Sequence, residues 1–500
     1  MNRNVCLITP PSPFLLDERV FLHLGILKVA SALEQRGHQV DFIDLSGIRN
    51  FLDVINSYLE ANKDKEDLVF GITATTPQVP HAVKICQAIK SKKDCKVILG
   101  GPHCTLMHTA SKRERLRGLE VSNRATEDVE RLADIFDVLV CGDGEHSIFE
   151  ALKIEKGIVD ADNRKSSLFL KNKDFSELPF PARHLVDLET YNYSIDGCSA
   201  TSLIAQLGCP FRCTFCGGRN SPFLRVIRQR SSDSVLREID HLYKTYGFKG
   251  FMFYDDELNV NKGFIELLNQ IIDYQETNGV EFHLRGFVKA ELFNDEQARA
   301  MRRAGFRWLL TGFESGDDRI LTNIRKNATR DDNTRCIETA KKNGLKVKAL
   351  MSVGHAGESH ESIANTKKWL LEVEPDEFDC TIITTYPGSP YFDDAKKENH
   401  YYVYTDSKSG DKLYQASVDY LSKLDYYKGD PEDGYISYVW TQNISAEELV
   451  SERDKLEADV RKKLNIRYNP SRPGMVYEHS MGMGNIDIPS HILRFTGLEK

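Results

Sequence analysis

The stretch Leu207-Gly-Cys209-Pro-Phe-Arg-Cys213-Thr-Phe-Cys216-Gly-Gly218 places three cysteines four and three residues apart. Their sulfur atoms can face one point only if the backbone wraps into a compact loop, and the proline and the glycines of the stretch favour such a loop. Thiolates are the usual ligands of a [4Fe–4S] cluster, which normally takes four of them. Cys209, Cys213 and Cys216 therefore predict a cluster with one iron that lacks a protein ligand and is open to a small molecule.

Two structural interpretations compete with a cluster. A closed zinc site needs a fourth nitrogen or sulfur ligand, and no Cys or His lies between Cys216 and His241. Three unrelated buried cysteines fit less well, because the stretch stands between the apolar, strand-like residues 202–207 and a glycine pair. We therefore favour the cluster.

The pattern C-x3-C-x-Phe-C formed by these residues resembles the signature of the radical S-adenosylmethionine (SAM) superfamily. The resemblance implies that SAM binds the open iron and that the backbone of Phe215 meets its adenine. It also implies a small-molecule substrate and a one-electron donor such as flavodoxin or ferredoxin.

The composition is that of a soluble globular chain with two or three domains: 500 residues, 41% hydrophobic and 28% charged. A formal charge of −8 without clustered Lys and Arg gives no sign of nucleic-acid binding. No stretch is apolar for long enough to span a bilayer, and the apolar run after Met1 is too short for a signal peptide, so we expect a cytoplasmic location. We interpret the eight cysteines outside the motif as ordinary buried thiols: Cys6, Cys86, Cys95, Cys104, Cys141, Cys198, Cys336 and Cys380.

Residues 1–150 alternate short apolar runs with amphipathic helical patterns. Strands are expected at residues 5–9, 39–44, 68–73, 96–100 and 138–142, with helices at 24–36 and 81–92. This order predicts a doubly wound, Rossmann-like parallel sheet with helices on both faces. Ligands of such sheets bind at the carboxyl ends of the strands, where small-residue turns gather in this sequence.

These turns resemble the cobalamin-binding domain of class B radical SAM enzymes, some of which keep the domain without using cobalamin. The implied cobalamin contacts are Pro10, Thr73, Thr75, Gly100, Gly101, Pro102, His103, Gly142, Gly144 and Glu145. The D-x-H-x-x-G motif that supplies a cobalt ligand in many cobalamin domains is absent. His103 and His23 could be proposed as cobalt ligands instead. A single histidine in a loop is more often solvated or hydrogen-bonded, and we favour that interpretation for both.

Residues 151–200 read as a linker, because Leu178-Pro-Phe-Pro-Ala182 favours an extended chain. In residues 201–390, strands at 202–207, 250–254, 281–287, 308–314, 346–353 and 379–385 alternate with helices at 231–246, 262–277, 295–304, 330–343 and 359–371. This alternation fits the open (β/α)6 barrel that radical SAM enzymes use, in which the chemistry sits at the carboxyl ends of the strands.

Polar residues and glycines stand at those strand ends: Asp255, Asp256 and Glu257, then Glu314 and Ser315, then Gly354 and Gly357. The resemblance assigns them in this order to the amino group, the ribose and the adenine of SAM. An acidic residue after a strand is also commonly a helix cap. Arg285, on the third strand, is expected to reach a carboxylate or a cobalamin side chain, with a surface salt bridge as the alternative.

Residues 391–500 are expected to form a mixed extension that covers the substrate and sets its choice. Nine tyrosines crowd residues 401–438 and suit either a substrate cover or a packed layer over the barrel mouth. A helix is expected at residues 446–464, and the tail after Pro470 shows no recognisable site.

These patterns together predict a cobalamin-dependent radical SAM enzyme. We expect it to cleave SAM reductively at the cluster and to functionalise an unactivated carbon of a small metabolite or natural-product intermediate by methyl transfer from methylcobalamin. One alternative is a radical rearrangement, cyclisation or dehydration with an empty cobalamin domain. Another is a non-catalytic cobalamin or iron sensor, against which the intact cysteine triad argues.

Overall fold

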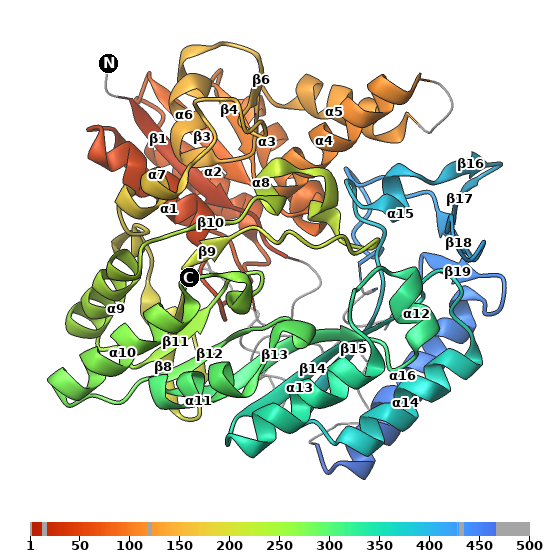
Figure 1. Ribbon diagram of the computed structural model, residues 1–500. Coiled ribbons are helices and arrows are strands. Elements are labelled where there is room, and N and C mark those ends of the chain that lie inside the picture. Colours follow the sequence, from red (N-terminus) through yellow and green to blue (C-terminus); the bar gives the residue numbers. More distant parts are fainter. Residues whose placement is uncertain (1–2, 13–17, 119–122, 428, 430–434, 467–500) are drawn as a thin grey trace.

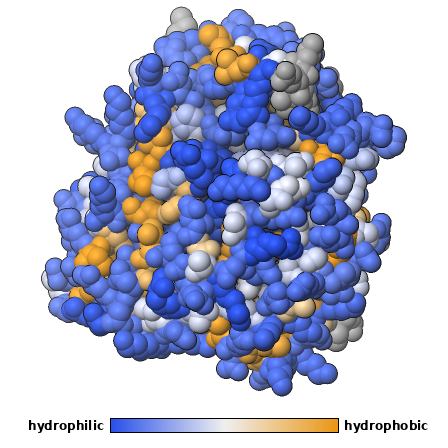
Figure 2. All heavy atoms as spheres, turned by 45° about the vertical axis from the view of Figure 1, so that its right-hand side comes forward, coloured by the Kyte–Doolittle hydropathy of each residue, from blue (hydrophilic) through white to orange (hydrophobic). Residues whose placement is uncertain are grey.

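The computed structural model describes residues 3–12, 18–118, 123–427, 429 and 435–466. Two α/β domains lie one above the other, and a smaller C-terminal part flanks both (Figure 1). The face in Figure 2 is largely hydrophilic, with hydrophobic side chains in small scattered groups. None of the described helices is both long and apolar enough to cross a membrane.

The N-terminal sheet is parallel and has the strand order β2-β1-β3-β4-β5-β6. Its strands are β1 (Asn4–Thr9), β2 (Gln39–Asp44), β3 (Leu68–Thr73), β4 (Val97–Gly100), β5 (Val138–Cys141) and β6 (Gly157–Asp160). The doubly wound sheet predicted from the sequence is confirmed. The boundary at residue 150 is too early, because β6 pairs with β5 and continues the same sheet.

Helices cover both faces of this sheet and give it two cores. They are α1 (Leu24–Gln35), α2 (Phe51–Ala61), α3 (Val79–Lys92), α4 (Pro102–Arg117), α5 (Arg124–Ile135) and α6 (Gly144–Lys153). Strand alternation splits β1, since Cys6 and Ile8 enter the core under α2 to α5 whereas Val5 and Leu7 enter the core under α1 and α6. Of these helices, only α1 and α3 are expected from the sequence pattern.

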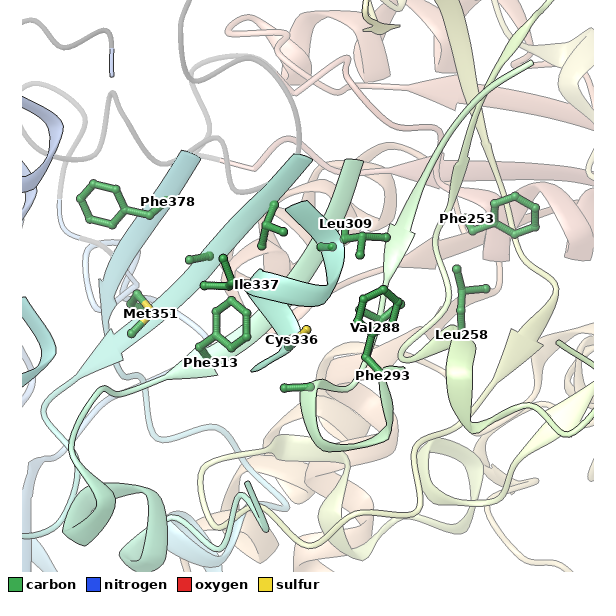
Figure 3. Close-up of a cluster of buried hydrophobic side chains, with 14 of the residues drawn as sticks. Phe253, Leu258, Val288, Phe293, Leu309, Phe313, Cys336, Ile337, Met351 and Phe378 are labelled. Atoms are coloured by element: carbon green, nitrogen blue, oxygen red, sulfur yellow. The ribbon is translucent and has the colours of Figure 1, made fainter. Parts of the chain in front are cut away.

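The second sheet is an open half-barrel with the order β15-β14-β13-β12-β11-β8-β7. After the edge strand β7 (Ser194–Ile195), six parallel strands follow: β8 (Cys198–Leu203), β11 (Gly250–Phe253), β12 (His283–Phe287), β13 (Phe306–Glu314), β14 (Lys346–Val353) and β15 (Glu377–Ile382). The helices between them are α9 (Ser232–Tyr246), α10 (Phe264–Asn278), α11 (Asp295–Ala304), α12 (Asp318–Asn323), α13 (Arg330–Lys342) and α14 (His360–Val373). Figure 3 shows part of the core between this sheet and its helices.

The expected strand at residues 202–207 is wrong. β8 ends at Leu203, and Gln206–Leu207 form a separate short strand, β9, that pairs antiparallel with β10 (Arg228–Gln229). The chain leaves the sheet here because the Asp255 carboxylate, 3.2 Å away, takes the Ala205 N–H.

The C-terminal part adds a four-stranded antiparallel sheet and a long helix. Its elements are α15 (Pro390–Asp393), β16 (Lys396–Glu398), β17 (Tyr401–Thr405), β18 (Lys412–Ala416), β19 (Val439–Thr441) and α16 (Ala446–Lys463). Most of the expected tyrosine cluster is packed, since Tyr402, Tyr404, Tyr420, Tyr426 and Tyr435 are buried. The tail after Pro470 lies outside the described residues.

Six of the eight cysteines outside the motif are buried as expected. Cys95 and Cys198 are only half-buried, which corrects the expectation for these two.

Candidate functional site: the cysteine loop and two cavities

The three motif cysteines lie on a loop that leaves β9 and is held by backbone hydrogen bonds. Cys209 N–H donates to Leu224 O at 2.9 Å, and Thr214 N–H donates to Ile324 O at 2.9 Å. Cys213 is buried, Cys209 is half-buried and Cys216 is exposed. Among the described residues, no three His, Cys, Asp or Glu side chains gather closely enough to hold a single metal ion.

The charges around the loop suit a metal cluster whose thiolate ligands carry negative charge. Burial raises the pKa of the Cys209 thiol to about 12. Burial also raises the pKa of Cys213, but Lys326 and Lys289 oppose this effect with buried positive charges. A metal that binds these sulfurs must displace their protons, and the two lysines offset the negative charge that results. The donor set therefore fits an iron–sulfur cluster.

The three carboxylates after β11 have different roles. The Asp255 carboxylate accepts the Ala205 N–H, and Asp256 Oδ2 accepts the Gly208 N–H at 2.9 Å. These two side chains therefore position the chain that leads into Cys209. Glu257 instead lines a cavity in the half-barrel, and its Oε2 is buried without a hydrogen-bond partner.

That cavity, the barrel cavity, holds about 790 Å³ of empty space. Its lining comes from strand ends and loops: Glu257, Phe287, Gly312, Glu314, Lys326, Leu350, Met351, Asp379, Thr381 and Tyr427. Burial raises the pKa of Glu257 to about 7, against the nearby Lys326 and Lys289. An orphaned carboxylate oxygen in such a place is suited to an ammonium group.

Glu314 reaches the barrel cavity from the strained end of β13. It has φ +67° at a β-bulge between β13 and β14, and such strain gathers at functional sites. Its Oε1 lies 3.1 Å from Lys326 Nζ, and its Oε2 accepts from Ser352 Oγ at 2.7 Å. Burial alone would raise the pKa of Glu314, but Lys326 and Ser352 hold it below the ordinary value.

The structure places the remaining expected SAM contacts away from the barrel cavity. Ser315 Oγ lies 3.1 Å from Thr366 Oγ1 on α14. Gly354 and Gly357 pack on the C-terminal part, since a Cβ on Gly357 would lie 2.5 Å from Asp411 Oδ2. The Phe215 ring lies beside that of His355, with 5.3 Å between ring centroids and a tilt of 59° between the ring planes. The roles of these residues toward SAM stay predictions.

A second cavity, the interdomain cavity, holds about 1010 Å³ of empty space at the carboxyl ends of the N-terminal strands. Seven of the ten expected cobalamin contacts line it: Thr73, Gly100, Gly101, Pro102, Gly142, Gly144 and Glu145. Ile204, Leu207 and Phe223 complete it from the second domain. The atom nearest to a Cβ on Gly100 would be 3.8 Å away, so the glycine leaves space for a ligand in this part of the cavity. This cavity is lined by glycines and apolar side chains, and it fits a large ring system with an apolar appendage.

The other three expected contacts do not line this cavity. Pro10 O and the Thr75 backbone are both held by the Gln78 side chain. His103 is neither a loop residue nor solvated, because it sits fully buried in the first turn of α4. Its two ring nitrogens have no partner among the described residues, and burial lowers its pKa to about 3. The ring is therefore neutral.

Sequence reasoning missed Lys289, Lys326, Asp143 and Arg228. Each is buried although its type is normally exposed, and each is paired with a residue distant in the chain. No spacing within the sequence marks such pairs.

Two family models match the two domains. Residues 19–133 match the B12 binding domain, and residues 203–370 match the Radical SAM superfamily. The chain therefore contains the two domains that mark cobalamin-dependent radical SAM enzymes, a class whose cofactors are a [4Fe–4S] cluster, SAM and cobalamin. Radical SAM enzymes need a reductant and a small-molecule substrate.

The chain is similar to named relatives of this class. An uncharacterized methyltransferase of Pyrococcus horikoshii is 26% identical over 80% of this chain and 85% of that protein. An anaerobic magnesium-protoporphyrin IX monomethyl ester cyclase of Rubrivivax gelatinosus is 25% identical, over 68% of this chain and only 62% of its own length. The solved structure of the radical SAM methyltransferase TsrM from Kitasatospora setae, with cobalamin and a [4Fe–4S] cluster bound, shares the fold. Its TM-score is 0.58 at 18% identity, over 78% of this chain and 77% of that chain.

Proposed function

We propose that the chain transfers a methyl group to an unactivated carbon of a small metabolite or natural-product intermediate. One observation carries this proposal: Leu207 lines the interdomain cavity and stands two residues before Cys209. Cobalamin in that cavity and a cluster on the cysteine loop would therefore be neighbours, as methyl transfer requires. The names of the methyltransferase relatives agree with this choice.

The residues of the barrel cavity would bind and orient SAM. Glu257 Oε2 accepts from the ammonium group, and the strained Glu314 accepts from the ribose hydroxyls. Lys326 and Ser352 hold Glu314 in place, so its orientation does not depend on the ligand. When bound, the cluster supplies the electron that cleaves SAM, and cobalamin supplies the methyl group. Phe287, Leu350 and Tyr427 then keep water from the substrate.

Anaerobic reconstitution with iron, sulfide, cobalamin, SAM and reductant tests this function. We expect release of 5′-deoxyadenosine and a substrate that gains the mass of one CH2 in a candidate panel. Cys213→Ala should lose both iron and 5′-deoxyadenosine, whereas Cys95→Ala, a half-buried thiol outside the motif, should keep them. Undiminished release from Cys213→Ala would refute the assignment.

The same assay separates the alternatives. A product without added mass, formed together with 5′-deoxyadenosine, favours rearrangement, cyclisation or dehydration. Cobalamin or iron binding without any 5′-deoxyadenosine favours a sensor.

Positive charge around the cysteine loop supports an acidic one-electron donor such as flavodoxin or ferredoxin. Burial and the neighbouring Arg225 and Arg212 lower the pKa of Arg219 to about 10. Burial, Arg212 and Arg164 also lower the pKa of Arg225. Among the described residues these four arginines form no ion pair, and Arg164 and Arg212 are exposed. Their mutual repulsion would be relieved by an acidic partner surface.

Reduction kinetics test this surface. Arg164→Glu with Arg212→Glu should slow 5′-deoxyadenosine release driven by reduced flavodoxin and reverse its salt dependence. Release driven by dithionite should not change. The matched control is Arg237→Glu, an exposed position on α9. Equal slowing with both reductants would mean that the variant damages the site and not the docking.

A further inference from the structure

Arg285 is a buried cation without a counter-ion in the part of the chain that the structure describes. It is 5% exposed, and its Nε and Nη2 are buried without hydrogen-bond partners. A guanidinium keeps its charge at any physiological pH. Buried charges in proteins are normally paired, so an unpaired one calls for a ligand.

The alternation of β12 directs Arg285 into the half-barrel. Leu284 belongs to the core under the helices, and a Cβ on Gly286 would meet Leu258 and Phe253 of that same core. Arg285 and Phe287 therefore point to the opposite face. Phe287 lines the barrel cavity, so Arg285 lies one layer deeper on the same wall.

A hydroxyl and an aromatic ring accompany Arg285 at this depth. Tyr193 is 3% exposed, and its hydroxyl interacts with the Arg285 guanidinium and with no other described group. The Cζ of Arg285 is 5.7 Å from the centre of the Trp308 ring. A guanidinium with two unpartnered nitrogens, a hydroxyl whose O–H donates to no described group and a flat aromatic ring thus meet deep in the half-barrel.

We infer that Arg285 and Tyr193 bind the carboxylate of the substrate, whose apolar body fills the barrel cavity. A guanidinium and a phenol hydroxyl both donate to carboxylate oxygens, and the pairing compensates the buried charge. Phe287, Leu350 and Met351 provide the apolar lining above them. This inference rests on the proposed function, because it places the acid group one layer below the barrel cavity that the SAM-binding carboxylates line.

The orientation of the substrate follows from this arrangement. Glu257 and Glu314 lie at the carboxyl ends of the strands, whereas Arg285 lies deeper on β12. The acid group would therefore anchor the deep end, and the reacting carbon would face the cysteine loop. The substrate class is an apolar monocarboxylic acid and not a neutral lipid or an amine.

Binding of matched acids and amides tests the inference. Calorimetry on the reconstituted full chain with SAM compares 4-phenylbutyrate with 4-phenylbutanamide, and octanoate with octanamide. We expect at least one acid to bind about tenfold more tightly than its amide, because hydrogen bonds to charged groups are the stronger ones. The preference should vanish in Arg285→Gln and weaken in Tyr193→Phe. Arg303→Gln, an exposed position on α11, is the matched control.

Thermal unfolding without ligand provides a second readout. If Arg285 has no partner until a ligand binds, the melting temperature of Arg285→Gln should be no lower than that of the wild type. If Arg285 instead stabilises the fold, the substitution should lower the melting temperature. The inference is overturned if neither acid binds more tightly than its amide, or if Arg285→Gln keeps the preference. It is also overturned if Arg285→Gln melts well below Arg303→Gln. Calorimetry needs no turnover, so a wild type that prefers acids but releases no 5′-deoxyadenosine would refute only the proposed function.

Discussion

Arg228 and Asp143 join the two domains through a buried ion pair, in which Nη1 of Arg228 lies 2.5 and 2.6 Å from the two carboxylate oxygens of Asp143. Arg228 belongs to β10, the partner of the strand that leads into Cys209. Asp143 stands between Gly142 and Gly144, which line the interdomain cavity. The pair therefore sets the position of the cysteine loop relative to the cobalamin-binding turns.

Removing the Asp143 charge should destabilise the chain. Asp143→Asn leaves the Arg228 guanidinium buried without its partner, which should lower the free energy of unfolding by about 3–5 kcal/mol. Urea denaturation measures the change. Asp419→Asn breaks the exposed pair with Arg131 and should cost at most about 1 kcal/mol. Similar losses in both variants would contradict the role of the Arg228 pair.

Two adjacent glycines should respond differently to alanine. Gly101 has φ +100°, and its Cβ would lie 2.7 Å from Thr73 Oγ1, so Gly101→Ala should destabilise the fold by about 1–3 kcal/mol. Gly100→Ala clashes with nothing but projects a methyl group into the interdomain cavity. It should keep the melting temperature and weaken cobalamin binding, which corrin absorbance measures. Unchanged cobalamin affinity in Gly100→Ala would place the corrin elsewhere.

The affinity for SAM should rise with pH through Glu257. Burial raises the pKa of this carboxyl to about 7, and the ammonium of SAM prefers the ionised form. Below pH 7 protonation should therefore weaken SAM binding by up to about tenfold per pH unit, and above pH 8 the dependence should disappear. Equilibrium binding of SAM at pH 6 to 8 measures this slope. Glu257→Gln should bind weakly with no slope, while Glu276→Gln, exposed on α10, should follow the wild type.

Lys326 should stabilise the fold through Glu314. Lys326→Met leaves the Glu314 carboxylate buried with only Ser352 as a partner, so the free energy of unfolding should fall by about 3–5 kcal/mol. Adding Glu314→Gln removes the unpaired charge and should restore part of that loss. Lys262→Met, at an exposed position, controls for the loss of one lysine charge. If the double variant is no more stable than Lys326→Met, the two side chains do not act as a pair.

Much of the fold could be predicted because short-range patterns encode it. The strands β2, β3 and β14 have the bounds that the pattern of neighbouring residues predicts. The predicted strand at 202–207 failed for a long-range reason, since Asp255 is 50 residues from the Ala205 amide that it bends out of the sheet. Equally, the run Asp255-Asp256-Glu257 does not reveal which carboxylate lacks a partner, because that depends on the chain folded around each one.

By itself, the sequence determined the fold class and the cofactors of this protein: three cysteines at fixed spacing and the order of strands and helices imply a cluster loop on a barrel behind a cobalamin domain. The cysteine spacing and the order of strands and helices are local properties, because loop geometry and strand periodicity depend on residues close together in the chain. Only the tertiary structure decided which side chains meet. Asp143 and Arg228 are 85 positions apart in the chain and form one buried contact, and the unpaired Arg285 becomes visible only when its surroundings are complete. Pairing and burial depend on neighbours that folding brings together, and no spacing along the chain records them.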